Sequence, residues 1–145
     1  MLVQVKTLPH FKGELPTYAT PFSSGLDLRA QLSEELQLRP TERVLVPTGL
    51  CFAIPQDFEI QIRPRSGWAL RSGITLLNTP GTIDADYRGE VKIIVINLGS
   101  EIVRIQDQDR IAQAVLCPII QVQWDVRDEL STTERGSGGF GSTYK

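Results

Sequence analysis

The chain has 145 residues, of which 41% are hydrophobic and 22% are charged, and its formal net charge is −2. This length and composition indicate one globular domain, while the slightly negative charge gives no general attraction to nucleic acid or to an anionic membrane surface. No apolar run of about 18 residues occurs, so we expect no membrane-spanning helix and a cytoplasmic protein.

Histidine and cysteine, which often carry catalysis, are scarce. His10 is the only histidine, and Cys51 and Cys117 both lie in apolar runs, where a free cysteine packs as a small hydrophobic side chain. There is no C-x-x-C or H-x-E pair, so the ligand spacing of a zinc site is missing. A carboxylate is therefore the main candidate for activating a water molecule.

Most of the chain reads as short strands bounded by Pro, Gly, Asn or Asp. Apolar and polar side chains alternate in FEIQIRPR, residues 58–65, and again over 122–126, which is the two-residue period of a strand. In chain order the elements expected are a short helix at 33–37, strands at 36–40, 43–49, 50–55 and 58–65, a second short helix at 68–73, and strands at 73–78, 90–97, 101–106, 110–120 and 122–126. This pattern predicts an all-β, jelly-roll-like barrel.

Two segments depart from a simple barrel. The run KIIVIN, residues 92–97, is apolar on both faces, which favours a strand buried on both sides and, in so small a domain, a subunit interface. After Leu130 the chain has almost no apolar residues. We therefore expect a β domain at 1–130 and a Gly-rich C-terminal arm at 131–145, with the functional residues in loops and in the arm.

Two motifs in the first half combine charge with glycine. In SSGLDLRA, residues 23–30, Asp27 stands in an apolar strand, where it is costly unless it pairs with a group such as Arg29 or holds water around a divalent cation. In PRSGWALRSG, residues 64–73, Arg65, Ser66 and Gly67 precede a helical turn. They suit a phosphate cradle, although Ser66 as a simple helix N-cap is the more common arrangement.

Three further motifs follow. NTPGTIDADYRGE, residues 78–90, reads as a hairpin with an irregular tip, where Asp84 and Asp86 either cap turns or supply a general base or metal ligand. DRIAQ, residues 109–113, places Arg110 and Gln113 beside a core strand. The arm itself carries RGSGGFGST, residues 135–143.

In this order the motifs SSGLDLRA, PRSGWAL, GTIDADYRGE, DRIAQ and RGSGGFGST resemble the five motifs of the trimeric dUTPases. The resemblance implies a β-rich subunit in a homotrimer that hydrolyses dUTP to dUMP and pyrophosphate, with Mg²⁺ bound to the triphosphate. This reaction keeps uracil out of DNA and supplies dUMP for thymidylate synthesis.

The resemblance also implies residue roles. Asp84 positions and deprotonates the attacking water, and Asp27 binds waters of the Mg²⁺ ion. For Asp86, on the other side of the same bend, the residue preferences of turns favour a structural role. The substrate-binding residues implied are Arg65, Ser66 and Gly67 for the inner phosphates, Gln113 for a polar contact, Arg135 for the γ-phosphate, Asn78, Thr82, Ile83 and Lys92 for the uracil edge, Tyr87 for the sugar, and Phe140, Gly141, Ser142 and Thr143 for closure over the uracil. The arm is expected to be disordered when the site is empty, to order over the substrate, and to come from a neighbouring subunit.

Three alternatives stay open at this level. A dCTP deaminase shares the fold but requires a catalytic glutamate in a different hairpin. A non-enzymatic, nucleotide-responsive regulator is a second possibility on the same scaffold, because a fold does not determine a function. A β-barrel that binds nucleic acid is disfavoured by the net charge of −2 and by the scattered aromatic residues.

Overall fold

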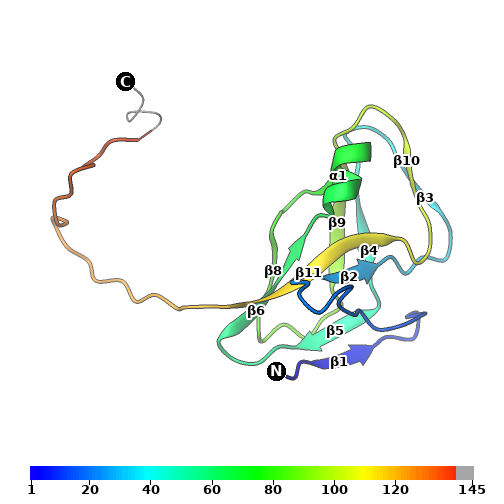
Figure 1. The fold of residues 1–145 in the computed structure, drawn as a ribbon, viewed down its shortest axis with the longest axis horizontal. Helices are drawn as coiled ribbons and strands as arrows, with labels where there is room; N and C mark the ends of the chain where they lie inside the picture. Colours follow the sequence, from blue (N-terminus) through cyan, green and yellow to red (C-terminus); the bar gives the residue numbers. More distant parts are fainter. Residues whose placement is uncertain (140–145) are drawn as a thin grey trace.

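The structure, a computed structural model, describes residues 1–139. Within that range it is built almost entirely of strands, with one short helix (Figure 1). The elements are β1 (Gln4–Thr7), β2 (Leu26–Arg29), β3 (Leu36–Leu38), β4 (Arg43–Pro47), β5 (Leu50–Ala53), β6 (Phe58–Arg63), α1 (Ser66–Ser72), β7 (Ile74–Leu76), β8 (Gly81–Ile83), β9 (Lys92–Asn97), β10 (Val103–Ile105) and β11 (Arg110–Pro118). The all-β prediction is confirmed.

The strands form four antiparallel sheets. The largest has the order β2-β11-β6-β8, the next has the order β4-β9-β7, and β1-β5 and β10-β3 are two-stranded. In the largest sheet, Gln113 of β11 is paired with Asp27 of β2 on one side and with Arg63 of β6 on the other. The sheet register thus brings together motifs that are far apart in the sequence.

The core lies between the sheets and consists of aliphatic side chains. In β9, Ile93 and Val95 are fully buried while Ile94 and Ile96 on the opposite face are only half-buried, as the two-residue period of a strand requires. Each fully buried Ile or Val stabilises the fold by about 1.5–3 kcal/mol relative to an exposed one. One face of β9 therefore belongs to the core of the domain, and the other is only partly covered.

The helix α1 begins two residues earlier than the predicted range 68–73. Its first bonds run from the backbone N–H groups of Trp68 and Ala69 to the carbonyl oxygen of Arg65, at 3.1 and 3.0 Å, so Arg65 is the N-cap and Ser66 is already helical. The expectation that Ser66 caps the helix is wrong for that reason. The helix ends at Gly73, whose φ of 66° is the left-handed conformation that glycine adopts without strain.

Two predicted elements are absent. Residues 33–37 are not a helix, because Leu36 and Gln37 pair with Ile105 and Arg104 of β10 and this tertiary pairing outweighs local helix propensity. Residues 122–126 do not form a strand, since the segment leaves the β body after β11 and meets no partner strand there (Figure 1). Its apolar side chains Val122, Trp124 and Val126 are 68%, 88% and 91% exposed.

Candidate active site

An aspartate and two arginines meet at one edge of the large sheet. The Nε of Arg65 donates to Oδ1 of Asp27 at 2.9 Å, and Nη1 of Arg110 donates to Oδ2 at 3.2 Å. Of the two possibilities for Asp27, the local pair with Arg29 does not form, because the Arg29 guanidinium bonds instead to the carbonyl oxygen of Gln108 at 2.8 Å. The Asp27 side chain is 29% exposed, so a ligand from the solvent can reach the ion pair of Asp27 and Arg65.

Gln113 completes what we call the arginine cluster, namely Asp27, Arg65, Arg110 and Gln113. Its Nε2 donates to the carbonyl oxygen of Pro64 at 3.0 Å, just before the helix. Gly25 lies against it, since a Cβ at position 25 would be 3.1 Å from Cδ of Gln113. Sequence reasoning gave no role to Arg110 or Gly25, although both stand inside the quoted motifs.

The second group of candidate residues lies at the tip of the β7–β9 hairpin. Leu76 of β7 pairs with Val95 of β9, which confirms the expected hairpin, while β8 within its tip pairs with β6 of the other sheet. Nine residues line a cavity of about 400 Å³ here, which we call the tip pocket: Leu45, Thr82, Ile83, Asp84, Tyr87, Glu90, Val91, Lys92 and Ile94. Asn78 is not among them and is exposed before β8.

The two aspartates of the tip are both exposed. The turn is closed by the backbone, where the N–H of Tyr87 donates to the carbonyl oxygen of Asp84 at 3.2 Å. Within residues 1–139 neither the Asp84 nor the Asp86 carboxylate accepts a hydrogen bond, so the alternative in which both cap turns is wrong, and no such bond supports the structural role expected for Asp86. The carboxylate of Asp84 is therefore available to accept a proton from a water molecule.

Glu90 was not identified from the sequence and is the most constrained carboxylate near the tip. Burial raises the pKa of Glu90, but hydrogen bonds from His10 and from the N–H of Gly49, together with the charge of Lys92, leave its pKa below the ordinary value of 4.5. The hydroxyl of Tyr87 donates to the backbone carbonyl oxygen of Glu90 at 3.1 Å. The side chain of Glu90 is thus ionised near neutral pH, and its backbone holds the Tyr87 phenol.

The remaining candidates lie elsewhere. The chain after β11 extends away from the β body (Figure 1). In its last described part the Nε of Arg135 donates to the carbonyl oxygen of Gly138 at 2.9 Å. Phe140, Gly141, Ser142 and Thr143 are outside the described residues. Within residues 1–139, no side-chain hydrogen bond or ion pair joins the arginine cluster to the tip pocket.

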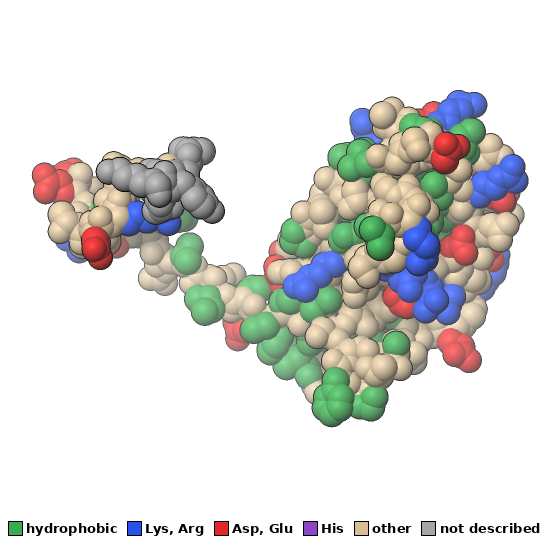
Figure 2. All heavy atoms as spheres, turned by 45° about the horizontal axis from the view of Figure 1, so that its top comes forward, with side chains coloured by type: hydrophobic (Ala, Val, Ile, Leu, Met, Phe, Trp, Pro, Cys, Tyr) green, Lys and Arg blue, Asp and Glu red, His purple; other side chains and the backbone are tan. Residues whose placement is uncertain are grey.

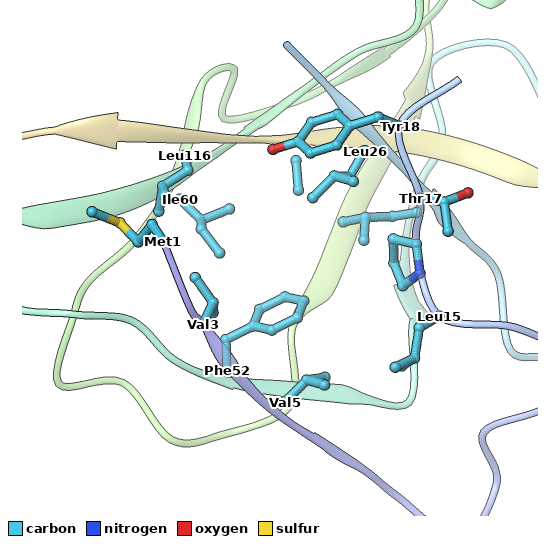
Figure 3. A pocket seen from close by; sticks show the side chains of 13 residues that line it. Met1, Val3, Val5, Leu15, Thr17, Tyr18, Leu26, Phe52, Ile60 and Leu116 are labelled. Carbon is cyan, nitrogen blue, oxygen red and sulfur yellow. The ribbon is translucent and has the colours of Figure 1, made fainter. Parts of the chain in front are cut away.

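A larger cavity, of about 610 Å³, is apolar and carries no charged side chain (Figure 3). Phe52 and Leu26 from the body, Val3 and Val5 from the N-terminal segment, and Tyr18 are among the residues that line it. We call it the apolar groove. It has the chemistry of a packing surface and not of a reaction site.

Comparisons with known proteins agree on one family. The family model described as dUTPase matches residues 12–144. The chain is 62% identical over 143 residues to the deoxyuridine 5'-triphosphate nucleotidohydrolase of Bdellovibrio bacteriovorus, covering 99% of this chain and 96% of that protein.

Solved structures show the same fold. The dUTPase of Staphylococcus bacteriophage 80alpha, solved with dUPNHPP, superposes with a TM-score of 0.87 at 25% identity and 98% coverage of both chains. A mutant dUTPase of phage phi11 of S. aureus, solved to reveal the coordination of a structural Mg(II) ion, superposes with a TM-score of 0.79 at 21% identity, covering 91% of this chain and 100% of that one. Among residues 1–139 there is no helix long and apolar enough to cross a membrane.

Proposed function

This chain belongs to the dUTPase family and hydrolyses dUTP, and we propose that it does so as a homotrimer whose active sites are shared between subunits. The observation that carries this proposal is the separation of the candidate residues into two groups. The arginine cluster holds the cationic donors, whereas the tip pocket holds Asp84 and Tyr87. A site that needs both groups is completed when the tip of one subunit faces the cluster of another.

Three apolar surfaces support the assembly. The outer face of β9 carries the half-buried Ile94 and Ile96, and the neighbouring Leu45 is 54% exposed. The segment after β11 leaves the body with its hydrophobic side chains uncovered (Figure 2). The apolar groove (Figure 3) offers such a segment from another copy a place to pack. Burying these surfaces between copies removes apolar area from water.

The arginine cluster is suited to the triphosphate. Attack on the α-phosphorus expels pyrophosphate, so negative charge grows on the bridging oxygen and is stabilised by fixed cations and donors. In the proposal Arg65, Ser66 and Gly67 hold the inner phosphates and Gln113 adds a polar contact. The exposed hydroxyl of Ser66 makes no hydrogen bond within residues 1–139, which leaves it available to a phosphate oxygen.

The tip pocket is suited to the water and the nucleoside. Asp84 positions the attacking water and takes its proton. The backbone around Thr82, Ile83 and Lys92, together with Asn78 from outside the pocket, presents donors and acceptors to the uracil edge. Cytosine exchanges donor and acceptor at one position, leaving buried groups unpaired at about 1–3 kcal/mol each. The ring of Tyr87 packs on the sugar and leaves no room for a 2′-hydroxyl.

The proposed arm, residues 131–145, closes over the site of a neighbouring subunit. Arg135 pairs with the γ-phosphate, Phe140 stacks on the uracil, Gly141 allows close approach of the backbone, and Ser142 and Thr143 supply hydroxyls. Closure removes water that competes for the same donors. Residues 131–137 of the arm are exposed in the free chain. This is compatible with an arm that becomes ordered only when the substrate binds.

Mg²⁺ is proposed to bind mainly to the triphosphate. Within residues 1–139 no three His, Cys, Asp or Glu side chains come together to form a metal cage, and this fits an ion that keeps most of its waters and bonds to phosphates. Asp27, partly exposed beside Arg65, would hold those waters. When bound, the ion would neutralise charge on the phosphate oxygens.

We also propose a cytoplasmic location. Both cysteines are free, as is usual for proteins of the reducing cytoplasm.

One experiment tests the substrate and a second tests the shared site. Pyrophosphate release is measured with dUTP, UTP, dTTP and dCTP, with and without Mg²⁺, and dUTP with Mg²⁺ is expected to be by far the best substrate. For the second, Arg65→Ala and Asp84→Asn are each expected to be nearly inactive, and subunits of the two variants are then mixed and reassembled. If sites are shared, some sites of the mixed trimers contain both native residues and activity returns, whereas no recovery means that each site lies within one subunit.

A further inference from the structure

Glu90 connects the end of the tip to a distant part of the β body. Its Oε1 accepts hydrogen bonds from Nε2 of His10 at 2.7 Å and from the backbone N–H of Gly49 at 2.8 Å. Nζ of Lys92 lies 3.5 Å from Oε2. The side chain is only 11% exposed, and a carboxylate so placed is held tightly because each lost partner leaves a buried charge less compensated.

The backbone beside Glu90 is tied to the same place. The N–H of Val91 donates to the carbonyl oxygen of Leu50 at 2.8 Å, and the buried hydroxyl of Thr48 donates to the carbonyl oxygen of Val91 at 2.6 Å. Gly49 itself has a φ of 67°, a conformation that favours glycine. Residues 90 and 91 are thus fixed on the turn between β4 and β5.

Tyr87 depends on this anchor for its position. Its hydroxyl donates to the carbonyl oxygen of Glu90 at 3.1 Å, and its ring covers Gly89, where an added Cβ would lie 2.6 Å from Cζ and 3.0 Å from Cε2 of the ring. The Tyr87 side chain is otherwise open, and the residue is 45% exposed. The ring is therefore placed by two neighbours, Gly89 beneath it and Glu90 at its hydroxyl.

We propose that Gly89 and Glu90 are positioning residues for Tyr87, and that through its ring they set the discrimination between a deoxyribose and a ribose substrate. The proposal rests on the role given above to Tyr87 as the residue that reads the sugar. A steric filter rejects the larger sugar only while the ring cannot move away. Fixing residue 90 to the β body by side chain and backbone prevents that movement.

The test compares kcat/KM for dUTP and for UTP in the full-length enzyme. Glu90→Ala and Gly89→Ala are each expected to lower the dUTP/UTP ratio by about tenfold or more, chiefly because kcat/KM for UTP rises. A rise for UTP is a readout that simple destabilisation does not produce, since loss of folded enzyme lowers both rates together. The melting temperature of each variant is measured alongside.

Asp107→Ala is the matched control. Asp107 also accepts one backbone N–H, from Leu32 at 2.8 Å, and pairs with a lysine, Lys12, at 3.0 Å, but it has no bond to the tip. This variant is expected to lose stability and keep its dUTP/UTP ratio within about twofold. If Glu90→Ala changes the two rates in the same proportion as Asp107→Ala does, the inference is overturned.

Two further variants separate the possible failures. Gly89→Ala leaves the side-chain contacts of Glu90 with His10, Gly49 and Lys92 in place and displaces the Tyr87 ring, so it decides the question if Glu90→Ala does not fold. Tyr87→Ala tests the premise. An unchanged ratio in Tyr87→Ala overturns the sugar-reading role and the inference with it. A lowered ratio in Tyr87→Ala with unchanged ratios in the variants at 89 and 90 overturns the inference alone.

Discussion

Asp27 and Arg65 form an ion pair of 2.9 Å between residues that are 38 positions apart in the chain. The same carboxylate accepts Nη1 of Arg110 at 3.2 Å from the other side. A guanidinium carries five N–H donors in a fixed fork, so each arginine keeps donors beyond those that it gives to Asp27. The carboxylate therefore holds two cations in place beside Ser66 and Gly67.

Replacing Asp27 by Asn removes the negative charge that separates Arg65 from Arg110. We expect kcat/KM for dUTP to fall by about tenfold or more, because the guanidinium groups repel each other and lose their alignment. The Mg²⁺ concentration for half-maximal activity should also rise. Glu35→Gln is the control, since Glu35 pairs with Arg104 at 3.4 Å on β10, away from the cluster. Equal effects of the two variants would contradict the role of Asp27.

Asp84→Asn should fold normally and bind dUTP, yet turn it over about 10²-fold more slowly or worse, as expected when a general base is lost. The neighbour Asp86 offers a close control, because it is also exposed on the same tip. Asp86→Asn should keep nearly full turnover. Single-turnover pyrophosphate release with both variants makes the comparison, and comparable losses in the two would remove the distinction between them.

The lowered pKa of Glu90 predicts a dependence of stability on pH. A carboxyl whose pKa is lower in the folded than in the unfolded state stabilises the fold above the unfolded value, here 4.5, and this contribution disappears as the pH falls through the folded value. Glu90→Gln should therefore be less stable than the unmodified protein at pH 7, and the difference should shrink below about pH 4.5. Urea unfolding at one fixed protein concentration measures it. A difference that stays constant down to pH 3 would show that the charge of Glu90 is not responsible.

Asn97 is fully buried at the end of β9 and is expected to be essential for stability. Its Nδ2 donates to the carbonyl oxygens of Leu38 and Glu101 at 2.9 and 2.8 Å, and its Oδ1 accepts the N–H of Gly99 at 2.9 Å. Asn97→Leu leaves three backbone groups without partners and should lower the free energy of unfolding by roughly 3 kcal/mol or more. Denaturant unfolding tests this, and a loss below roughly 1 kcal/mol would mean that water replaces the amide.

Deleting residues 135–145 removes none of the core residues found within 1–139, so the shortened protein should fold and assemble with nearly the same melting temperature. It should lose most activity, because Arg135 and Phe140 leave together. Arg135→Ala should reproduce part of that loss, and Arg127→Ala, which breaks only the exposed pair with Asp125, should not. A non-hydrolysable dUTP analogue with Mg²⁺ should also protect the full-length arm from proteolysis. An unaltered kcat/KM after the deletion would leave the arm without a catalytic role.

The local sequence was sufficient to predict structural features that depend only on residues close together in the chain. The two-residue alternation in 58–65 predicted β6, because successive side chains of a strand point to opposite faces. Gly73 in the left-handed conformation ends α1 close to the predicted boundary. The five motifs and their order were sufficient to identify the family. Each motif is a contiguous run of residues, so it can be recognised without knowing which parts of the fold it contacts.

Partners across the fold were decided only by the tertiary structure. The sequence left open whether Asp27 pairs with Arg29, and the folded chain offers it Arg65 and Arg110 instead, which are 38 and 83 positions away. The sequence allowed both a helix at 33–37 and a strand at 36–40, and the pairing of Leu36 with Ile105 of β10 decided for the strand. Glu90 acquired His10 as a partner across 80 positions. Such contacts arise from chain packing and carry no local periodicity. The alternating pattern of this sequence predicted most of its strands and its ordered motifs placed it in its family, whereas three-dimensional packing decided which charged groups face one another.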